Sequence, residues 1–342
     1  MSQKGTTPFQ EFARKRMRIE NSYIKEAISE FLASLIVCVF AVAAVTQHIL
    51  QPGNDSMQPA LGGVLGLMIA ILVCGGISGP HLNPAVTLGL AIAGHLSWAK
   101  VPVYFVAQIF GGFVGAGLAA ANYYWVGHGK FTEVIPAGAF AHITTETPVA
   151  NGILDQTIGT AILLMTVLAV IDKRNMEVPK HLIPLYLALT VAALLFCFGY
   201  NSGSPLNPAR DLGPRLMAIA IGYSVDEVFT PGGQQWWTVG FFGPLIGGAI
   251  GSVMYIVLIG AHLKDTEEEA LEKKNTQFSS QFQPQRQPSQ MYQSGGPVFN
   301  GGSNMQRNQG RNGPSNYPYD MNGNMSPNQY QFRGGANTKS YA

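Results

Sequence analysis

The chain alternates between long apolar stretches and short polar connections over most of its length. A transmembrane helix needs about 20 predominantly apolar residues, and six stretches come close to that length. Two further apolar stretches, near 84–93 and 208–221, are too short to cross a bilayer. The pattern therefore predicts an all-α integral membrane protein in a lipid bilayer. We expect its spanning helices near 27–48, 60–78, 102–123, 155–171, 181–199 and 237–260.

Both short stretches begin with the tripeptide Asn-Pro-Ala, within GISGPHLNPAVTLGL and within YNSGSPLNPARDLGP. Proline is favoured at the first position of a helix, and asparagine is a favoured N-cap. Each tripeptide therefore predicts a short helix that begins inside the membrane. The candidate residues of these two turns are Asn83, Pro84, Ala85, Asn207, Pro208 and Ala209.

The spacing of the two tripeptides predicts an internal repeat. Asn83 and Asn207 are 207 − 83 = 124 residues apart, and three spans separate equivalent points. Because three is odd, the two halves lie in the membrane with opposite orientation, as in transporters built from inverted repeats. We expect the repeats at about 26–125 and 152–262, and the functional site where they meet. The expected fold is thus six transmembrane helices plus two re-entrant half-helices.

Two half-helices that meet N-terminus to N-terminus bring their positive dipole ends together. Irregular backbone at that depth is tolerated only where it lines a watery cavity. The Asn side chains supply donors there. This arrangement predicts a narrow polar path that passes neutral hydrogen-bonding molecules and repels cations and protons. The residues expected to offer carbonyl oxygens along it are Gly79, Pro80, His81, Gly203 and Pro205.

Basic residues set the expected orientation, because cytoplasmic loops are rich in Lys and Arg. They gather in the first 25 residues, in the connection at 172–180 and after the sixth span, so both termini are expected in the cytoplasm. Trp125, Trp236 and Trp237 are expected at the outer membrane interface and Trp98 at the inner one. Asn54 begins a glycosylation sequon in an expected outer loop.

Composition divides the chain into three parts. Only 12% of the 342 residues are charged, against about 25% in soluble domains. A cytoplasmic tail is expected over 1–25 and a channel domain over 26–262. Residues 263–342 are rich in Gln, Asn, Gly, Pro and Ser, which predicts a disordered cytoplasmic tail. The net charge of +2 gives no indication of a nucleic-acid partner.

Other chemistry is sparse in this sequence. The three cysteines, Cys38, Cys74 and Cys197, lie inside apolar runs and are expected to be buried, with no metal spacing and no cofactor. We find no nucleophile–base pair and no phosphate loop, so an enzyme is not expected. The histidines in or near loops, His95, His128 and His142, are expected to be ordinary exposed side chains.

The stretches HLNPAVT at 81–87 and NPARDLGPR at 207–215 resemble the aquaporin and glycerol-facilitator family, the major intrinsic proteins. The resemblance covers about 26–262 and implies one pore per subunit and a homotetramer. Asp211 and Arg215 resemble the glycerol-permeable branch of that family. Gly240 and Phe241 depart from it, because that branch usually has a proline followed by an aliphatic residue there.

The resemblance also implies a constriction with four corners. Transferred by spacing from each Asn, these corners are Gly63, Leu195, Ser204 and Arg210. The arginine would donate to hydroxyl groups and reject cations. The small residues imply a wide pore for glycerol, water and other small neutral solutes, such as hydrogen peroxide and urea.

Three polar residues inside spans are expected to support the re-entrant loops. In this family a carboxylate at the position of Glu30 hydrogen-bonds the loop backbone. Gln156 departs from the usual glutamate at the matching point of the fourth span, and Gln108 is a further candidate anchor.

Two other functions remain open from the sequence. A coupled secondary transporter also uses inverted repeats, but it normally needs titrating residues along its path, and the spans offer little beyond Glu30. A water-selective or closed protein that acts through its tail is the second. The plasma membrane is the default location.

Overall fold

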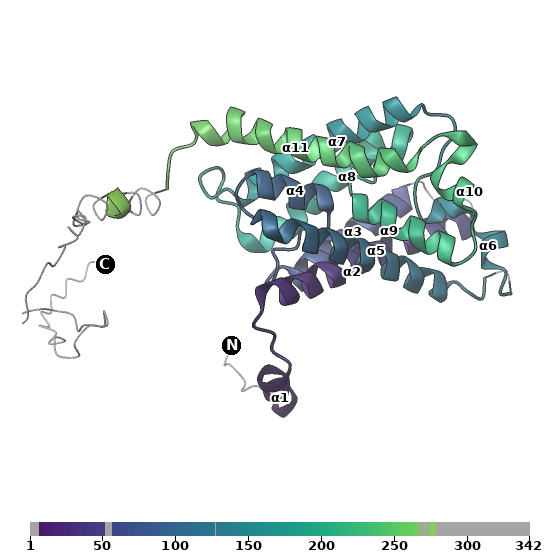
Figure 1. Ribbon diagram of the computed structural model, residues 1–342, viewed down its shortest axis with the longest axis horizontal. Coiled ribbons are helices and arrows are strands. Elements are labelled where there is room, and N and C mark those ends of the chain that lie inside the picture. The colour runs from purple at the N-terminus through teal and green to yellow at the C-terminus, as the bar shows by residue number, and fades with distance from the viewer. Residues whose placement is uncertain (1–6, 52–56, 127, 267–270, 272–273, 278–342) are drawn as a thin grey trace, which may run out of the picture. The chain divides into compact units, whose positions relative to one another are not determined.

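The computed structural model describes residues 7–51, 57–126, 128–266, 271 and 274–277, and over these residues it is helical with no strand. Figure 1 shows the long helices as a bundle around two short ones. Asn54 and most of the expected tail at 263–342 lie outside the described residues.

Among the described residues, six helices are long and apolar enough to cross a membrane, which confirms the expected number. Three of them differ at an end from the hydrophobic pattern. The first begins at Ser22 because the side chain of Asn21 caps it, and the second ends at Cys74, before Gly75 and Gly76. The fourth begins directly after Pro148. The six are α2 (Ser22–Leu50), α3 (Met57–Cys74), α5 (Val101–Asn122), α7 (Val149–Ile171), α8 (Ile183–Ser202) and α11 (Trp237–Leu258).

The two expected half-helices are α4 (Pro84–Ile92) and α9 (Pro208–Ala220). Each packs against spans of both halves: α4 against α11, α5 and α7, and α9 against α5, α11 and α2. The part of the chain that the structure describes also contains three short α-helices: α1 (Pro8–Arg16), α6 (Phe131–Val134) and α10 (Val225–Phe229). The 3-10 turns are Trp98–Lys100, Ala137–Ala139, Lys180–Leu182, Pro231–Gly233 and Gly260–His262.

Glycines bring the same pair of helices together in each half. A side chain at Gly111 or Gly115 of α5 would meet the backbone of α2, and one at Gly247 or Gly251 of α11 would meet the backbone of α7. Small residues at this spacing let helix backbones approach closely. The pairs α2–α5 and α7–α11 therefore form the scaffold that holds α9 and α4.

Two expectations about burial in the spans and at their ends are wrong. Cys197 is exposed on α8 rather than buried, because it lies on the outward face of that helix. Trp236 is buried instead of standing at a lipid interface, since its indole N–H donates to the His142 carbonyl at 3.0 Å.

Candidate functional site

The two Asn-Pro-Ala turns have nearly the same geometry. Asn83 and Asn207 are extended, with φ of −153° and −152°, and each caps the half-helix that follows. The Asn83 side-chain oxygen accepts from the Ala85 N–H at 2.8 Å, and that of Asn207 accepts from the Ala209 N–H at 2.9 Å. Both carbonyl-type oxygens are therefore occupied by helix ends, which leaves the amide N–H groups for other partners.

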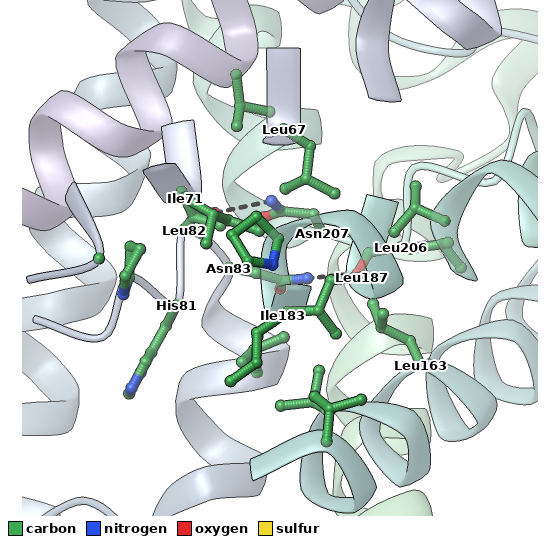
Figure 2. Close-up of a pocket in the computed structure, with 18 of the residues that line it drawn as sticks. Leu67, Ile71, His81, Leu82, Asn83, Leu163, Ile183, Leu187, Leu206 and Asn207 are labelled. Atoms are coloured by element: carbon green, nitrogen blue, oxygen red, sulfur yellow. Dashed lines mark hydrogen bonds between the residues drawn. The ribbon is translucent and has the colours of Figure 1, made fainter. Parts of the chain in front are cut away.

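The two halves are cross-linked at this point. Asn83 Nδ2 donates to the Leu206 carbonyl and Asn207 Nδ2 donates to the Leu82 carbonyl, both at 2.8 Å (Figure 2). An amide nitrogen carries two N–H groups. Each asparagine therefore has one side-chain N–H that the cross-link does not use, and this N–H can donate a hydrogen bond to a solute.

Leu82 and Leu206 stand in the left-handed region, both with φ of 52°. This conformation is unusual for a leucine, and such strain costs on the order of 1–3 kcal/mol per residue. Both leucines are held at each end: the carbonyl binds an asparagine of the other half, and the N–H binds a residue of α2 or α7. The strained turns thus depend on hydrogen bonds from outside themselves.

In the first half, Glu30 supplies this support. Its two oxygens accept from the N–H groups of His81 and Leu82, both at 2.9 Å. Gln108 Nε2 donates to the same carboxylate at 2.7 Å and to the Thr87 hydroxyl at 2.9 Å. A fully buried carboxylate with three donors is well satisfied.

In the second half, Gln156 accepts a hydrogen bond from one backbone N–H instead of two. Its side-chain oxygen accepts from the Leu206 N–H at 2.9 Å, and its amide donates to the Ser202 hydroxyl at 2.5 Å. The residue that corresponds to His81 is Pro205, which has no N–H. One acceptor is therefore enough here, and this explains why an amide can stand where the first half uses a carboxylate.

Asp155 was missed by sequence reasoning. It is 6% exposed in α7 and accepts from the Ser202 hydroxyl and, at 3.4 Å, from Asn201 Nδ2. An ionisable residue at the start of an expected span was the available signal. Together with Gln156, it fixes the end of α8 directly before the second turn.

A cavity of about 1410 Å³ passes both turns. Gly138 and His142 line it near the start of α7, and Lys173, Lys180 and His181 line it beyond the end of α7. These mouths are separated by the 23 residues of that helix, which is about 34 Å. All five expected carbonyl residues also line the cavity: Gly79, Pro80, His81, Gly203 and Pro205.

All four expected corners line the same cavity. A side chain at Gly63 would meet nothing within 4 Å, so this corner is open space. The Ser204 hydroxyl is buried and has no hydrogen-bond partner within the described part of the chain. Arg210 Nη1 donates to the Phe140 carbonyl at 3.0 Å, which fixes the guanidinium at the wall. Leu195 adds an apolar wall.

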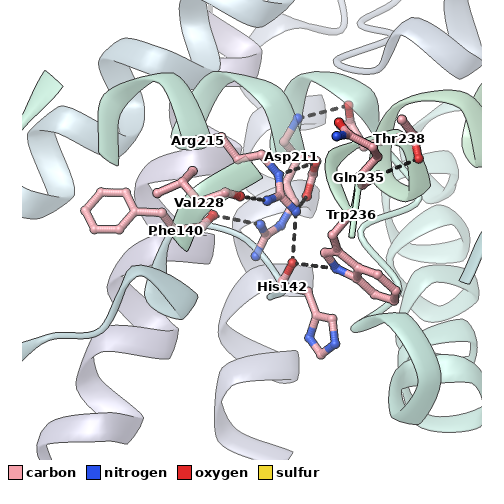
Figure 3. A network of polar contacts seen from close by, with 10 residues as sticks. Phe140, His142, Asp211, Arg215, Val228, Gln235, Trp236 and Thr238 are labelled. Atoms are coloured by element: carbon pink, nitrogen blue, oxygen red, sulfur yellow. Dashed lines mark hydrogen bonds and ion pairs between the residues drawn. The ribbon is translucent and has the colours of Figure 1, made fainter. Parts of the chain in front are cut away.

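The expected branch residues form a buried ion pair (Figure 3). Arg215 Nε lies 2.7 Å from Asp211 Oδ2, and both side chains are almost completely buried. The guanidinium also donates to the carbonyls of Val228 and His142. Arg215 therefore ties α9 to the loops at 137–148 and 221–236, and the first of these loops lines one mouth of the cavity through Gly138 and His142.

His142 is not the ordinary exposed histidine that was expected. It lines the cavity, its Nε2 is buried without a hydrogen-bond partner among the described residues, and its ring packs against Gly203. Burial lowers the pKa of His142 below its ordinary value of 6.5, and the neighbouring carboxylate of Asp211 opposes part of that shift. The loop pattern gave no sign of this burial.

Lowering the pH should destabilise the protein through His142. Because its folded pKa is depressed, the unfolded chain takes up a proton first, so stability falls as the pH drops below about 6.5. Thermal unfolding midpoints between about pH 7.5 and pH 5.5 should therefore fall more steeply for the parent than for His142→Asn. Equal slopes for the two proteins would contradict this role of His142.

The chain is similar to proteins of one family over most of its length. Residues 17–255 match the family described as Major intrinsic protein. Aquaporin-3 of Milnesium tardigradum is 40% identical over 267 residues, which cover 73% of this chain and 81% of that protein. Aquaglyceroporin-2 of Rhizophagus irregularis is 38% identical over 245 residues, 69% of this chain and 77% of that protein.

A solved structure supports the same assignment. The X-ray structure of the aquaglyceroporin from Plasmodium falciparum matches with a TM-score of 0.63 and 30% identity, over 70% of this chain and 98% of that chain. Sequence and fold therefore agree, and the chain belongs to the major intrinsic protein family.

Proposed function

We propose that the protein is a passive channel for glycerol and water. The observation that carries this proposal is the single cavity that runs past both Asn-Pro-Ala turns and remains open at Gly63. Relatives named aquaglyceroporins, at 30–38% identity, support the glycerol-permeable assignment.

The cavity wall suits a polyol, which has hydroxyl groups and an apolar carbon chain. Donors come from the spare amide N–H groups of Asn83 and Asn207 and from Arg210. Leu67, Leu187 and other aliphatic side chains surround these donors (Figure 2). Cations meet two converging helix N-termini and a fixed guanidinium, so neutral solutes are favoured. Urea and hydrogen peroxide are also small, neutral and able to accept these hydrogen bonds, so we expect them to pass as well.

Gly63→Trp should reduce glycerol entry by at least about tenfold, because an indole would fill the open corner of the cavity while leaving the helix intact. Stopped-flow light scattering of proteoliposomes, with glycerol and water gradients run side by side, measures both fluxes. Leu65→Trp is the matched control, since Leu65 lies two residues further along α3 and is 50% exposed. It should leave both fluxes unchanged.

Two outcomes would contradict the proposal. Fast water flux without glycerol flux in the parent would indicate a water-selective channel. Glycerol accumulation above the external concentration in the presence of an ion gradient would indicate a coupled transporter.

Topology, domains and assembly are part of the proposal. The Lys and Arg distribution supports cytoplasmic termini, a channel domain over 26–262 and, by default, a plasma-membrane location. A homotetramer with one pore per subunit follows from family membership. Exposed aliphatic residues along the spans, among them Val73, Leu189 and Val257, fit a surface covered by lipid or by neighbouring subunits.

A further inference from the structure

Helix α1 lies outside the channel domain proposed above, and sequence reasoning missed it within the expected tail at 1–25. The signal was a capping box: Thr7 accepts from the Gln10 N–H, and the Gln10 side chain accepts from the Thr7 N–H. Pro8 stands at the first helical position. The helix is therefore specified by its own sequence.

The helix has an apolar face that no described residue of the chain covers. None of its residues is buried, and Phe9 and Phe12 are 73% and 56% exposed. Phe9, Phe12 and Ala13 lie on one face at the i, i+3, i+4 spacing of an amphipathic helix. Glu11 and Lys15 lie on the other face. An exposed aromatic pair of this kind marks a site of interaction.

Its charge indicates the partner. Arg14, Lys15 and Arg16 form the last turn, against the single acidic residue Glu11 in the first turn. Basic and aromatic residues on opposite sides of a helix are typical of helices that lie in a membrane interface and attract anionic lipids. Arg14 and Lys15 lie away from the aromatic pair, whereas Arg16 lies on the apolar face, seven residues after Phe9. Its side chain is long enough to extend the charge towards the headgroups.

The residues around the first turn of α2 indicate where the membrane–water interface lies along this helix. Lys100 forms an ion pair with Glu26 at 2.8 Å and lies 5.7 Å from the centre of the Tyr23 ring. Trp98, two residues before Lys100, is 59% exposed. Trp, Tyr and Lys side chains gather at the membrane–water boundary. The start of α2 therefore lies at the headgroup level.

A short connection keeps α1 near this level. Residues 17–21 join Arg16 to Ser22, and five residues reach at most about 18 Å. Such a tether gives an effective concentration in the millimolar range, so weak surface binding is enough to hold the helix.

We propose that α1 is an in-plane membrane anchor that inserts Phe9 and Phe12 into the adjacent leaflet and binds anionic phospholipid headgroups through Arg14, Lys15 and Arg16. The occupant of the apolar face is the membrane that the same chain spans. Each of the three basic side chains should increase the equilibrium constant for binding of α1 to an anionic surface by about fivefold.

The test uses the full chain in vesicles of phosphatidylcholine with or without phosphatidylserine. A variant with Cys38, Cys74 and Cys197 replaced by alanine receives one new cysteine, at Ala13 on the apolar face or at Glu11 on the opposite face. An environment-sensitive fluorophore on each reports burial. We expect a blue-shifted emission and severalfold less quenching by aqueous iodide at position 13 only, with a larger effect in phosphatidylserine.

Two sets of substitutions separate the contribution of the aromatic side chains to membrane binding from that of the three basic side chains. Phe9→Ser with Phe12→Ser should remove the protection at position 13 in both lipids. Arg14→Gln, Lys15→Gln and Arg16→Gln should remove only the phosphatidylserine effect. Glycerol flux reports folding in each variant and should not change. Equal quenching at positions 11 and 13, or no response to either set, would overturn the proposal.

Hydrogen exchange on the unmodified chain is an independent test that needs no cysteine replacement. Amides of α1 should exchange more slowly in nanodiscs that contain phosphatidylserine than in phosphatidylcholine alone. Equally fast exchange in both lipids would overturn the proposal. If the parent protein conducts no glycerol, the proposed function is contradicted, but the proposal that α1 is a membrane anchor still stands.

Discussion

Replacing Glu30 with glutamine is expected to reduce glycerol and water flux by about tenfold, although the substitution changes only one atom of the side chain. The carboxylate accepts from two backbone N–H groups and from Gln108. A glutamine has one acceptor oxygen, and its amide would face a buried N–H. A buried donor without an acceptor costs about 1–3 kcal/mol, which is enough to displace the strained turn at Leu82.

Flux per reconstituted molecule measures this effect, with Glu26→Gln as the matched control. Glu26 lies one turn earlier on α2 and binds Lys100 and Tyr104 instead of the re-entrant loop. It should retain nearly full flux. If Glu30→Gln keeps the flux of the parent while Glu26→Gln loses it, the support assigned to Glu30 is wrong.

In the second half, the match between acceptor oxygens and backbone N–H groups can be tested by adding one of each. Pro205→Ala creates a backbone N–H for which Gln156 has no free oxygen, and Gln156→Glu provides one. Each single substitution should reduce thermal stability. The double variant should recover part of the loss, with a coupling of about 0.5–3 kcal/mol between neighbouring sites. Additive losses would mean that the new N–H does not face position 156.

Arg215→Met is expected to lower stability by about 3–5 kcal/mol, because it leaves the buried carboxylate of Asp211 without its partner. It also removes the donor to the Val228 carbonyl. The His142 carbonyl keeps a donor, since the Trp236 indole remains. We therefore expect a large fall in the thermal unfolding midpoint and a poorly folded mouth.

The double variant Asp211→Ala with Arg215→Met separates charge burial from packing. Removing both charges should restore much of the lost stability, since paired buried charges are often replaceable by apolar residues. Unfolding midpoints of detergent-solubilised protein, followed by intrinsic fluorescence, give the double-mutant cycle. A double variant that is less stable than Arg215→Met alone would show that the carbonyl contacts of Arg215, and not the ion pair, hold the mouth.

Sequence reasoning predicted the features that depend on the length of apolar stretches and on short local motifs. Span length identified the six helices in the described ranges that are long and apolar enough to cross a membrane. The Asn-Pro-Ala signal placed both half-helices to within one residue. The residues transferred by spacing, such as Gly63 and Arg210, line the cavity. Their roles in selectivity remain predictions, which the flux measurements test.

The features that were missed depend on contacts between distant segments. His142 and Trp236 lie in loops without periodicity. The His142 carbonyl accepts hydrogen bonds from Arg215 of α9 and from the Trp236 indole, so distant segments meet at this point. The support from Asp155 depends on where α8 ends, and hydrophobicity did not fix that end. Tertiary contacts of this kind leave no repeat in the sequence.

The crossed asparagine bonds have a consequence for synthesis. The partner carbonyl of Asn83 belongs to a residue 123 positions later in the chain. At a translation rate of 5–20 residues per second, the ribosome needs roughly 6–25 s to reach it. During that interval the first re-entrant turn has Glu30 but no opposite half, and its amide must remain solvated by water or by the insertion machinery. The channel is therefore completed only after Leu206 has entered the membrane, so a chain truncated before Leu206 contains α2, α3, α5, α7 and α8 but no partner for the Asn83 amide.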